Sequence, residues 1–178
     1  YPATAQETFE AILAGYFDPN PCLVFEHKLL YWSKSGEIDF DGDLASVWRP
    51  RTYCQGDDLT IVALGAMVHE SLQAAAKSER SIEVINPFVL QPLAIAPIVE
   101  SVRKTGRLLV VQESGETQGL GDRIISLVSQ RCHHRLKSPP RLVSAPDLPV
   151  PFAPELEGQT RPGWEKIDLA IEETCWDD

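Results

Sequence analysis

Glu113 is the residue of this 178-residue chain whose type and position best suit a binding site or an interface. It lies near the end of the apolar run RLLVVQES, residues 107–114, which has the composition of a buried strand. A carboxylate at the carboxyl edge of a parallel strand lies where ligand sites and subunit contacts form. The alternative is that Glu113 caps a neighbouring element or makes a local salt bridge.

The loop Gly119-Leu120-Gly121 follows this strand and opens the next predicted helix. Its backbone N–H groups could face an anion, as at other helix N-termini. However, the loop lacks the third glycine of a dinucleotide-binding fingerprint, and no acidic residue follows at the ribose position. The pattern therefore favours close packing of the strand against the helix.

The histidines do not form a recognisable metal-binding set. His133 and His134 are adjacent, so on a helix their side chains point about 100° apart, and no cysteine or carboxylate completes a ligand set. Both are expected on the solvated surface, as is His69, which stands beside Glu70 on a predicted helix. No Ser–His–Asp, Cys–His or carboxylate pair can be assembled. The residues therefore predict no complete active site.

The composition excludes several classes of partner. With 26 acidic and 16 basic side chains the formal net charge is −10, which disfavours nucleic acid and anionic membranes because both are bound through Lys and Arg clusters. No apolar run approaches the roughly 20 residues of a membrane span, and no signal peptide is visible. The cysteines are far apart without a CxxC pair, which indicates reduced thiols and a cytoplasmic protein; they are Cys22, Cys54, Cys132 and Cys175.

An alternation of strands and helices positions these side chains. Strands separated by helices pair in parallel, through right-handed crossovers that place helices on both faces of the sheet. The sequence therefore predicts an α/β fold, a three-layer α/β/α sandwich with a mostly parallel sheet. The predicted strands are 59–64, 81–85, 107–114 and 141–145, and the predicted helices are 66–76, 95–105, 122–136 and 164–174.

The first 55 residues differ from this pattern. Thr4 and Glu7 have the spacing of a capping box at the start of a helix, and Cys22 to Phe25 is a strand-like run. One helix and one strand cannot bury their own apolar faces, so residues 1–32 are interpreted as the tail of a preceding α/β domain. Residues 33–55 carry no sustained periodicity and are predicted to be a linker, with the second domain at 56–178.

Several strings, in collinear order, resemble the C-terminal domain of transketolase-like enzymes. They resemble most closely the β subunit of the thiamine-diphosphate-dependent decarboxylating component of 2-oxo acid dehydrogenases, of the pyruvate, branched-chain and acetoin types. Residues 1–32 resemble the helix and strand that close the pyrimidine-binding domain of that subunit. The strings are DLTIVALGAMVHESLQAAA, IEVINPFVLQPL, VRKTGRLLVVQES, GLGDRIISLV and APDLPVPFAPELE.

The resemblance implies an oxidoreductase that decarboxylates a 2-oxo acid and transfers the acyl group to lipoyl. It implies thiamine diphosphate with magnesium in the parent enzyme, a heterotetramer with an α subunit, β–β self-association and docking to a dihydrolipoyl acyltransferase core. In this family the activating carboxylate lies in the pyrimidine-binding domain, upstream of the position of Tyr1. These 178 residues are therefore expected to hold no catalytic or cofactor-binding residue, to be inactive alone and to serve assembly and docking.

The resemblance also implies a potassium site around the turn Asp18-Pro19-Asn20-Pro21. The expected ligands are the backbone carbonyl oxygens of Gly15, Tyr16, Asp18 and Asn20. Oxygen ligands suit a hard cation. A plain turn without an ion is the alternative.

The chain departs from the family pattern at several positions. Gln112 stands where the family often has His, and Arg123 stands where Glu is common. In the family segment D-x-R-x-x-x-P-x-D only Pro92 is retained; the other positions are Asn86, Phe88 and Ala94. Two alternatives therefore stay open: the C-terminal domain of a transketolase or deoxyxylulose-phosphate synthase, and a non-catalytic interaction module.

Overall fold

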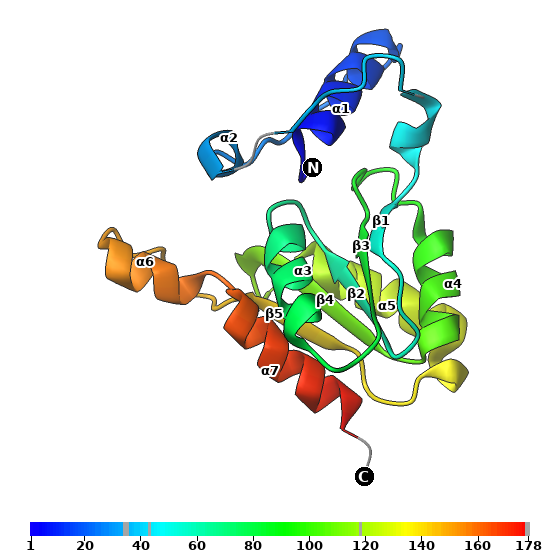
Figure 1. The fold of residues 1–178 in the computed structure, drawn as a ribbon, viewed down its shortest axis with the longest axis vertical. Coiled ribbons are helices and arrows are strands. Elements are labelled where there is room, and N and C mark those ends of the chain that lie inside the picture. Colours follow the sequence, from blue (N-terminus) through cyan, green and yellow to red (C-terminus); the bar gives the residue numbers. More distant parts are fainter. Residues whose placement is uncertain (34–35, 43, 118, 177–178) are drawn as a thin grey trace.

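A five-stranded sheet forms the centre of the computed structural model, with the strand order β1-β3-β2-β4-β5 (Figure 1). The structure describes residues 1–33, 36–42, 44–117 and 119–176. Four neighbouring strands are parallel and the edge strand β1 is antiparallel to β3. The strands are β1 (Arg51–Cys54), β2 (Leu59–Ala63), β3 (Ile82–Asn86), β4 (Leu108–Gly115) and β5 (Arg141–Ala145).

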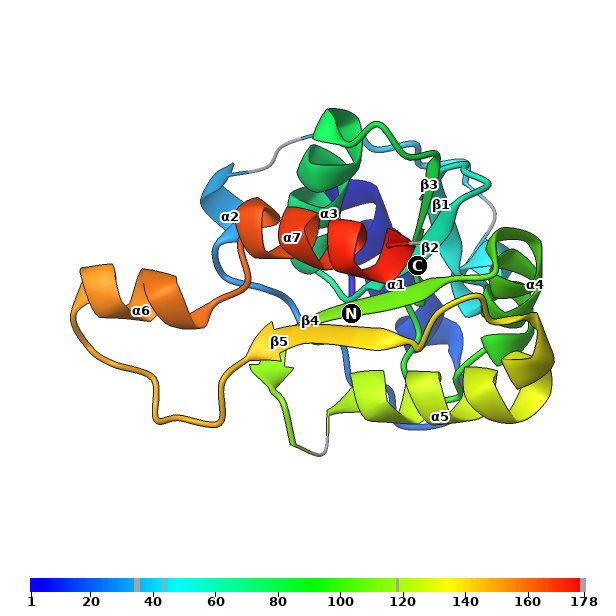
Figure 2. The ribbon, with the colours of Figure 1, turned by 90° about the horizontal axis from the view of Figure 1, so that it is seen from below.

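Two pairs of helices cover the two faces of the sheet. The helices α3 (Met67–Lys77) and α7 (Trp164–Cys175) pack together on one face. The helices α4 (Ile95–Thr105) and α5 (Leu120–Cys132) pack together on the other face (Figure 2). The predicted three-layer α/β/α sandwich is therefore confirmed.

The core divides into two clusters because successive side chains of a strand point to opposite faces of the sheet. The cluster under α3 and α7 contains Ile61, Ala63, Leu109, Val111, Met67, Ile167 and Ile171. The cluster under α4 and α5 contains Val62, Val110, Ile98, Val102, Ile124 and Val128. The central strands are thus apolar on both faces, as is usual for parallel strands covered by helices on each side.

The remaining elements lie outside this sandwich. The helices α1 (Ala5–Phe17) and α2 (Leu30–Ser33) lie beyond the carboxyl edge of the sheet, and α6 (Pro154–Thr160) projects away from it (Figure 1). Two short 3-10 helices are η1 (Leu44–Trp48) and η2 (His133–Arg135). In the described part of the chain, no helix is long and apolar enough to cross a membrane.

Two sequence expectations need correction. Residues 22–25 were predicted to be a strand, but they form none in the structure; a strand needs neighbours for its backbone hydrogen bonds, and none of the described strands pairs with them. The sheet also begins inside the predicted linker 33–55, because β1 pairs with β3. A four-residue edge strand has too few residues to show a period, so only its pairing reveals it. Residues 34, 35 and 43 of that linker lie outside the described residues.

Candidate functional site at the carboxyl edge of the sheet

Glu113 joins the N-terminal segment to the sheet. Its Oε2 atom lies 2.7 Å from Nε2 of His27, which belongs to the segment between α1 and α2. The two side chains are 29% and 16% exposed, so solvent screens this pair less than a surface ion pair. The other ring nitrogen of His27, Nδ1, is buried and has no hydrogen-bond partner within the described residues. Sequence reasoning did not single out His27, because no local pattern links two residues 86 positions apart.

The ring of Tyr1 occupies the turn that follows β2. Gly65 in this turn has φ +55°, and a Cβ atom there would lie 2.8 Å from Cε1 of Tyr1. The chain leaves β2 for β3 on one side and returns to β4 on the other, which makes this edge the switch point where open α/β sheets bind ligands. Burial and the charge of Glu113 raise the pKa of the Tyr1 phenol. The customary ligand crevice is thus filled by the chain itself.

A buried carboxylate, Glu7, fixes the start of α1 on the sheet. Thr4 Oγ1 accepts a hydrogen bond from the Glu7 backbone N–H at 3.1 Å, as the capping-box spacing predicts. Glu7 Oε2 accepts from the Ala3 N–H at 2.6 Å and from Asn86 Nδ2 at 3.2 Å. Glu7 Oε1 accepts from the Tyr53 hydroxyl at 2.6 Å. Burial, followed by the charge of Glu7, raises the pKa of Tyr53.

A second carboxylate of α1 makes a similar contact one turn later. Glu10 is buried and forms an ion pair with Arg51 of β1. The Arg51 guanidinium also donates to Ser46 Oγ at 2.9 Å and lies 5.4 Å from the ring centroid of Phe88. Phe88 is 1% exposed and has φ +61°. Phe88 stands where the family pattern has Arg. In this chain the position therefore holds an aromatic ring against which the Arg51 guanidinium packs.

Gln112 organises the glycine loop. Its Nε2 atom donates to the Gly115 carbonyl and its Oε1 atom accepts from the Gly121 N–H, both at 2.8 Å. A Cβ atom at Gly119 would lie 2.0 Å from Gln112 Nε2, and one at Gly121 would lie 2.5 Å from Leu142 Cδ1. The Gly121 N–H is therefore engaged within the protein, and these glycines allow close packing of the loop on β4 and β5. Residue 118 of the loop lies outside the described residues.

Asp147 holds the other end of the same loop. Its Oδ1 atom accepts from the Thr117 N–H at 3.1 Å, and its Oδ2 atom accepts from the Thr117 hydroxyl. These hydrogen bonds from Thr117 hold the pKa of Asp147 below its ordinary value. The connection after β5 is thereby tied to the loop after β4.

The predicted potassium turn lies at the C-terminal end of α1. The Asp18 N–H donates the last helical hydrogen bond, to the Ala14 carbonyl at 3.0 Å, and the extended backbone of Asp18 ends the helix. Asp18 Oδ1 accepts from the Asn20 N–H at 2.8 Å and from Asn20 Nδ2 at 3.0 Å. Gly15 and Tyr16 are in the last turn, where carbonyl groups lack an intrahelical donor. The structure thus places the four named residues next to one another.

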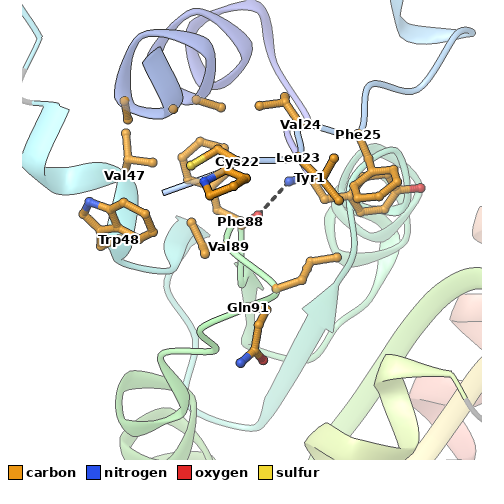
Figure 3. Close-up of a pocket in the computed structure, with 15 residues that line it drawn as sticks. Tyr1, Cys22, Leu23, Val24, Phe25, Val47, Trp48, Phe88, Val89 and Gln91 are labelled. Carbon is orange, nitrogen blue, oxygen red and sulfur yellow. Dashed lines mark hydrogen bonds between the residues drawn. The ribbon is translucent and has the colours of Figure 1, made fainter. Parts of the chain in front are cut away.

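A mainly apolar cavity of about 300 Å³ separates this segment from the loop after β3. Figure 3 shows Cys22, Leu23 and Val24 on one side and Phe88 and Val89 on the other. At its edge the Tyr1 amino group donates to the Phe88 carbonyl at 2.8 Å (Figure 3). The segment after α1 therefore lies over the loop that follows β3, with space between them.

The N-terminal segment exposes several large apolar side chains. Trp32 is 90% exposed and Leu23 is 83% exposed. Other exposed large side chains of this segment are Tyr16, Phe17, Phe25, Leu29 and Tyr31. An apolar surface of this kind is typical of a face that another domain or chain covers.

The remaining histidines have distinct surroundings. His69 Nε2 lies 2.7 Å from the Ala3 carbonyl oxygen, so the prediction that it faces solvent is wrong. His133 and His134 are exposed in η2, as predicted. The described residues contain no group of three His, Cys, Asp or Glu side chains that could hold a metal ion. All four cysteines are free thiols.

Comparison with known proteins agrees with this fold. The family model for the transketolase C-terminal domain matches residues 50–167. Among solved structures, a split gene transketolase, described as an inactive beta4 tetramer, has a TM-score of 0.63 and 25% identity. This match covers 72% of the present chain and 43% of that chain.

Curated relatives match both parts of the chain. The 2-oxoisovalerate dehydrogenase subunit beta of Bacillus subtilis (strain 168) is 30% identical, over 97% of this chain and 54% of the relative. The pyruvate dehydrogenase E1 component subunit beta of Rhizobium meliloti (strain 1021) is 28% identical, over 98% of this chain and 39% of the relative. The acetoin:2,6-dichlorophenolindophenol oxidoreductase subunit beta of Bacillus subtilis (strain 168) is 34% identical, over 93% of this chain and 49% of the relative.

The chain thus spans about half the length of the curated relatives it matches. The family match covers every strand and helix of the sandwich up to the first turn of α7, and the relatives extend it through the N-terminal segment. The chain belongs to the transketolase C-terminal domain family and is a relative of the β subunits of 2-oxo acid dehydrogenases.

Proposed function

We propose that this chain is part of the β subunit of the decarboxylating component of a 2-oxo acid dehydrogenase. That enzyme would oxidatively decarboxylate a 2-oxo acid and pass the acyl group to lipoyl. One observation carries the proposal: the similarity to β subunits runs through the N-terminal segment as well as the sandwich, over 97% and 98% of the chain. A relative of the C-terminal domain alone would match only residues 50–167.

Within such an enzyme these residues would serve assembly and docking. Tyr1, Glu7, Glu10 and His27 fix the N-terminal segment to the sheet and so set how its exposed apolar side chains are presented. We propose that the rest of the pyrimidine-binding domain, the α subunit and a second β subunit cover these side chains. The exposed apolar side chains between β5 and α6 offer a separate surface for the dihydrolipoyl acyltransferase core; they are Leu148, Val150 and Phe152.

The described residues do not fit thiamine diphosphate with magnesium. A diphosphate would need free backbone N–H donors, but the Gly121 N–H is bonded to Gln112 and the crevice beside Gly65 is filled by Tyr1. In the parent enzyme the cofactor would supply the carbon–carbon bond chemistry from outside these residues. The role of this chain in that reaction is therefore structural, and no catalytic step is assigned to its side chains.

We also propose a potassium ion at the end of α1. The backbone carbonyls of Gly15, Tyr16, Asp18 and Asn20 are hard oxygen donors, and the C-terminal end of a helix carries a partial negative charge that favours a cation. The test is a thermal unfolding series of the parent enzyme in potassium and sodium chloride at equal ionic strength. A higher unfolding temperature in potassium supports the site, and equal temperatures contradict it.

The proposed reaction is tested with the full-length protein, co-expressed with an α-type partner. Decarboxylation of pyruvate, branched-chain and aromatic 2-oxo acids is measured with an artificial electron acceptor, with and without thiamine diphosphate and magnesium. We expect turnover that requires both the cofactor and the partner. We also propose that the enzyme works in the cytoplasm, where its four free thiols stay reduced. Absence of turnover with every acid in an assembled complex would refute the proposal.

A transketolase is the second candidate, because a transketolase structure shares the fold at 25% identity. It predicts ketol transfer between sugar phosphates by the same full-length protein. A non-catalytic interaction module predicts neither reaction, and no change in stability when thiamine diphosphate is added. The three candidates therefore give different results in one set of assays.

A further inference from the structure

A basic segment interrupts this acidic chain. No Asp or Glu lies between Asp122 and Asp147, whereas the formal net charge of the whole chain is −10. The middle of this stretch holds Arg131, His133, His134, Arg135 and Lys137, and we name these five residues the basic patch. All five side chains are exposed.

The fold gathers the basic patch at one corner of the sandwich. Arg131 lies at the end of α5, and the two histidines and Arg135 form η2. The Lys137 N–H donates to the Gly106 carbonyl at 2.8 Å, which brings the patch against the C-terminal end of α4. Both ribbon views show the segment after α5 beside that end of α4 (Figures 1 and 2). The patch therefore lies at the amino edge of the sheet, opposite the His27–Glu113 pair.

The C-terminal ends of α4 and α5 neutralise only part of the positive charge of the basic patch. Arg131 Nη1 donates to the Leu127 carbonyl at 3.1 Å, and Lys137 Nζ donates to the Thr105 carbonyl at 3.2 Å. Arg131, Arg135 and Lys137 form no ion pair within the described residues. Each helix C-terminus carries a partial charge of about −0.5, so two helix ends leave about +2 of the three full charges uncompensated.

The neighbouring cations are different, because carboxylates already neutralise them. Arg103 Nη1 lies 2.7 Å from Glu100 Oε1, and Lys104 forms an ion pair with Glu83. At this corner of the sandwich the uncompensated charge therefore belongs to the basic patch and not to Arg103 or Lys104. Exposed guanidinium groups form bidentate hydrogen bonds with carboxylates, and the exposed rings of His133 and His134 add further polar groups beside them.

We propose that the basic patch docks a short acidic segment of a partner polypeptide. A short acidic segment can contact the patch alone, whereas a longer nucleic acid extends its charge over the rest of a chain whose formal net charge is −10 and is repelled there. The proposal does not depend on the reaction assigned above, because the patch lies on the opposite edge of the sheet from the candidate site.

The test uses the full-length protein in its native assembly and a fluorescein-labelled oligoglutamate peptide as the probe. Fluorescence anisotropy gives the affinity at low and at physiological ionic strength. Reversal of the two arginines, Arg131→Glu with Arg135→Glu, is expected to weaken binding about tenfold, since each exposed ion pair contributes modestly. Lys28→Glu is the control, because it reverses one charge at an exposed site outside the patch; it makes half the change in charge of the double reversal and should leave the affinity within about twofold.

The outcomes separate the possible occupants. Binding that is lost in the double reversal and kept in Lys28→Glu supports the proposal. Absence of binding at low ionic strength, or equal loss in both variants, overturns it. Tighter binding of a single-stranded oligothymidylate, or salt-sensitive self-association that Arg135→Glu abolishes, also overturns it and assigns the patch to nucleic acid or to a second copy. If the double reversal does not fold, Arg135→Gln alone should weaken binding about threefold.

Discussion

The Nε2 atom of His27 lies 2.7 Å from the Oε2 atom of Glu113, although 86 positions separate the two residues in the sequence. One residue belongs to the N-terminal segment and the other to the carboxyl end of β4. With Tyr1 beside them, the two side chains cover the edge at which open α/β sheets usually bind ligands. The edge is therefore a contact between the two parts of the chain.

Glu113→Gln should lower the free energy of unfolding by about 1–2 kcal/mol, because it removes a charged acceptor from a partly buried histidine. Glu173→Gln is the control, since Glu173 is 60% exposed in its pair with Arg141, and it should cost less than about 0.5 kcal/mol. Urea unfolding of the chain measures both variants. Equal effects would show that the His27–Glu113 contact contributes no more than a surface pair.

Tyr53→Phe should lower the free energy of unfolding by about 1–3 kcal/mol, because the buried Glu7 carboxylate loses a hydrogen-bond donor. Tyr16→Phe is the control: Tyr16 is 79% exposed, and its change should stay within about 0.5 kcal/mol. Denaturant unfolding measures both. A neutral Tyr53→Phe variant would mean that water replaces the hydroxyl beside Glu7.

The raised pKa of Tyr53 predicts how the stability of the chain changes at alkaline pH. Burial and the charge of Glu7 raise the pKa of Tyr53 above its ordinary value of 10.0. Above that pH the unfolded chain releases the proton while the folded chain keeps it, so the free energy of unfolding falls as the pH rises. Below it this contribution is constant. Tyr53→Phe should therefore show a shallower loss of stability above pH 10.0 in urea unfolding at a series of pH values, and an identical slope would contradict the raised pKa.

Gly119→Ala should lower the free energy of unfolding by roughly 1–3 kcal/mol, because its Cβ atom would overlap the Gln112 amide. Gly158→Ala is the matched control, since a Cβ atom there meets nothing within 4 Å. Gly158 lies in α6, so alanine should raise stability by about 0.5–1 kcal/mol. Opposite signs of the two changes, measured by thermal unfolding, are the expected result. If both variants lower the free energy of unfolding, the overlap with Gln112 is not the specific cause of the loss at Gly119.

Thr117→Val should raise the pKa of Asp147 toward its ordinary value of 3.8, because it removes the hydroxyl that donates to the carboxylate. A depressed pKa means that this contact contributes to stability above pH 3.8, and that the contribution is lost as the pH falls through the folded-state pKa. An NMR titration of the Asp147 carboxyl carbon measures the shift. Thr160→Val, a hydroxyl lost from α6, should leave that titration unchanged.

Much of the sandwich could be predicted from local pattern alone. The strands β2, β3, β4 and β5 and the helices α3, α4 and α7 appear within one residue of their predicted bounds, because apolar periodicity and glycine stops act over a few residues. The helix predicted for 122–136 ends at Cys132 and continues as η2. The sequence predicts no element between β5 and α7, but the structure has α6 there, which has no buried face and hence no periodic signal.

The sequence by itself determined the fold class, the family resemblance and the helix N-cap at Thr4, and it singled out Glu113 as a candidate site or interface residue. It could not supply the partner of Glu113, the place of Tyr1 over Gly65, or the use of Gln112 as the support of the glycine loop. These contacts join residues that the chain brings together only when the N-terminal segment and the helices pack on the sheet. Secondary structure arises from neighbours in sequence, whereas the carboxyl edge of the sheet is assembled from neighbours in space, and only the tertiary structure decides which they are.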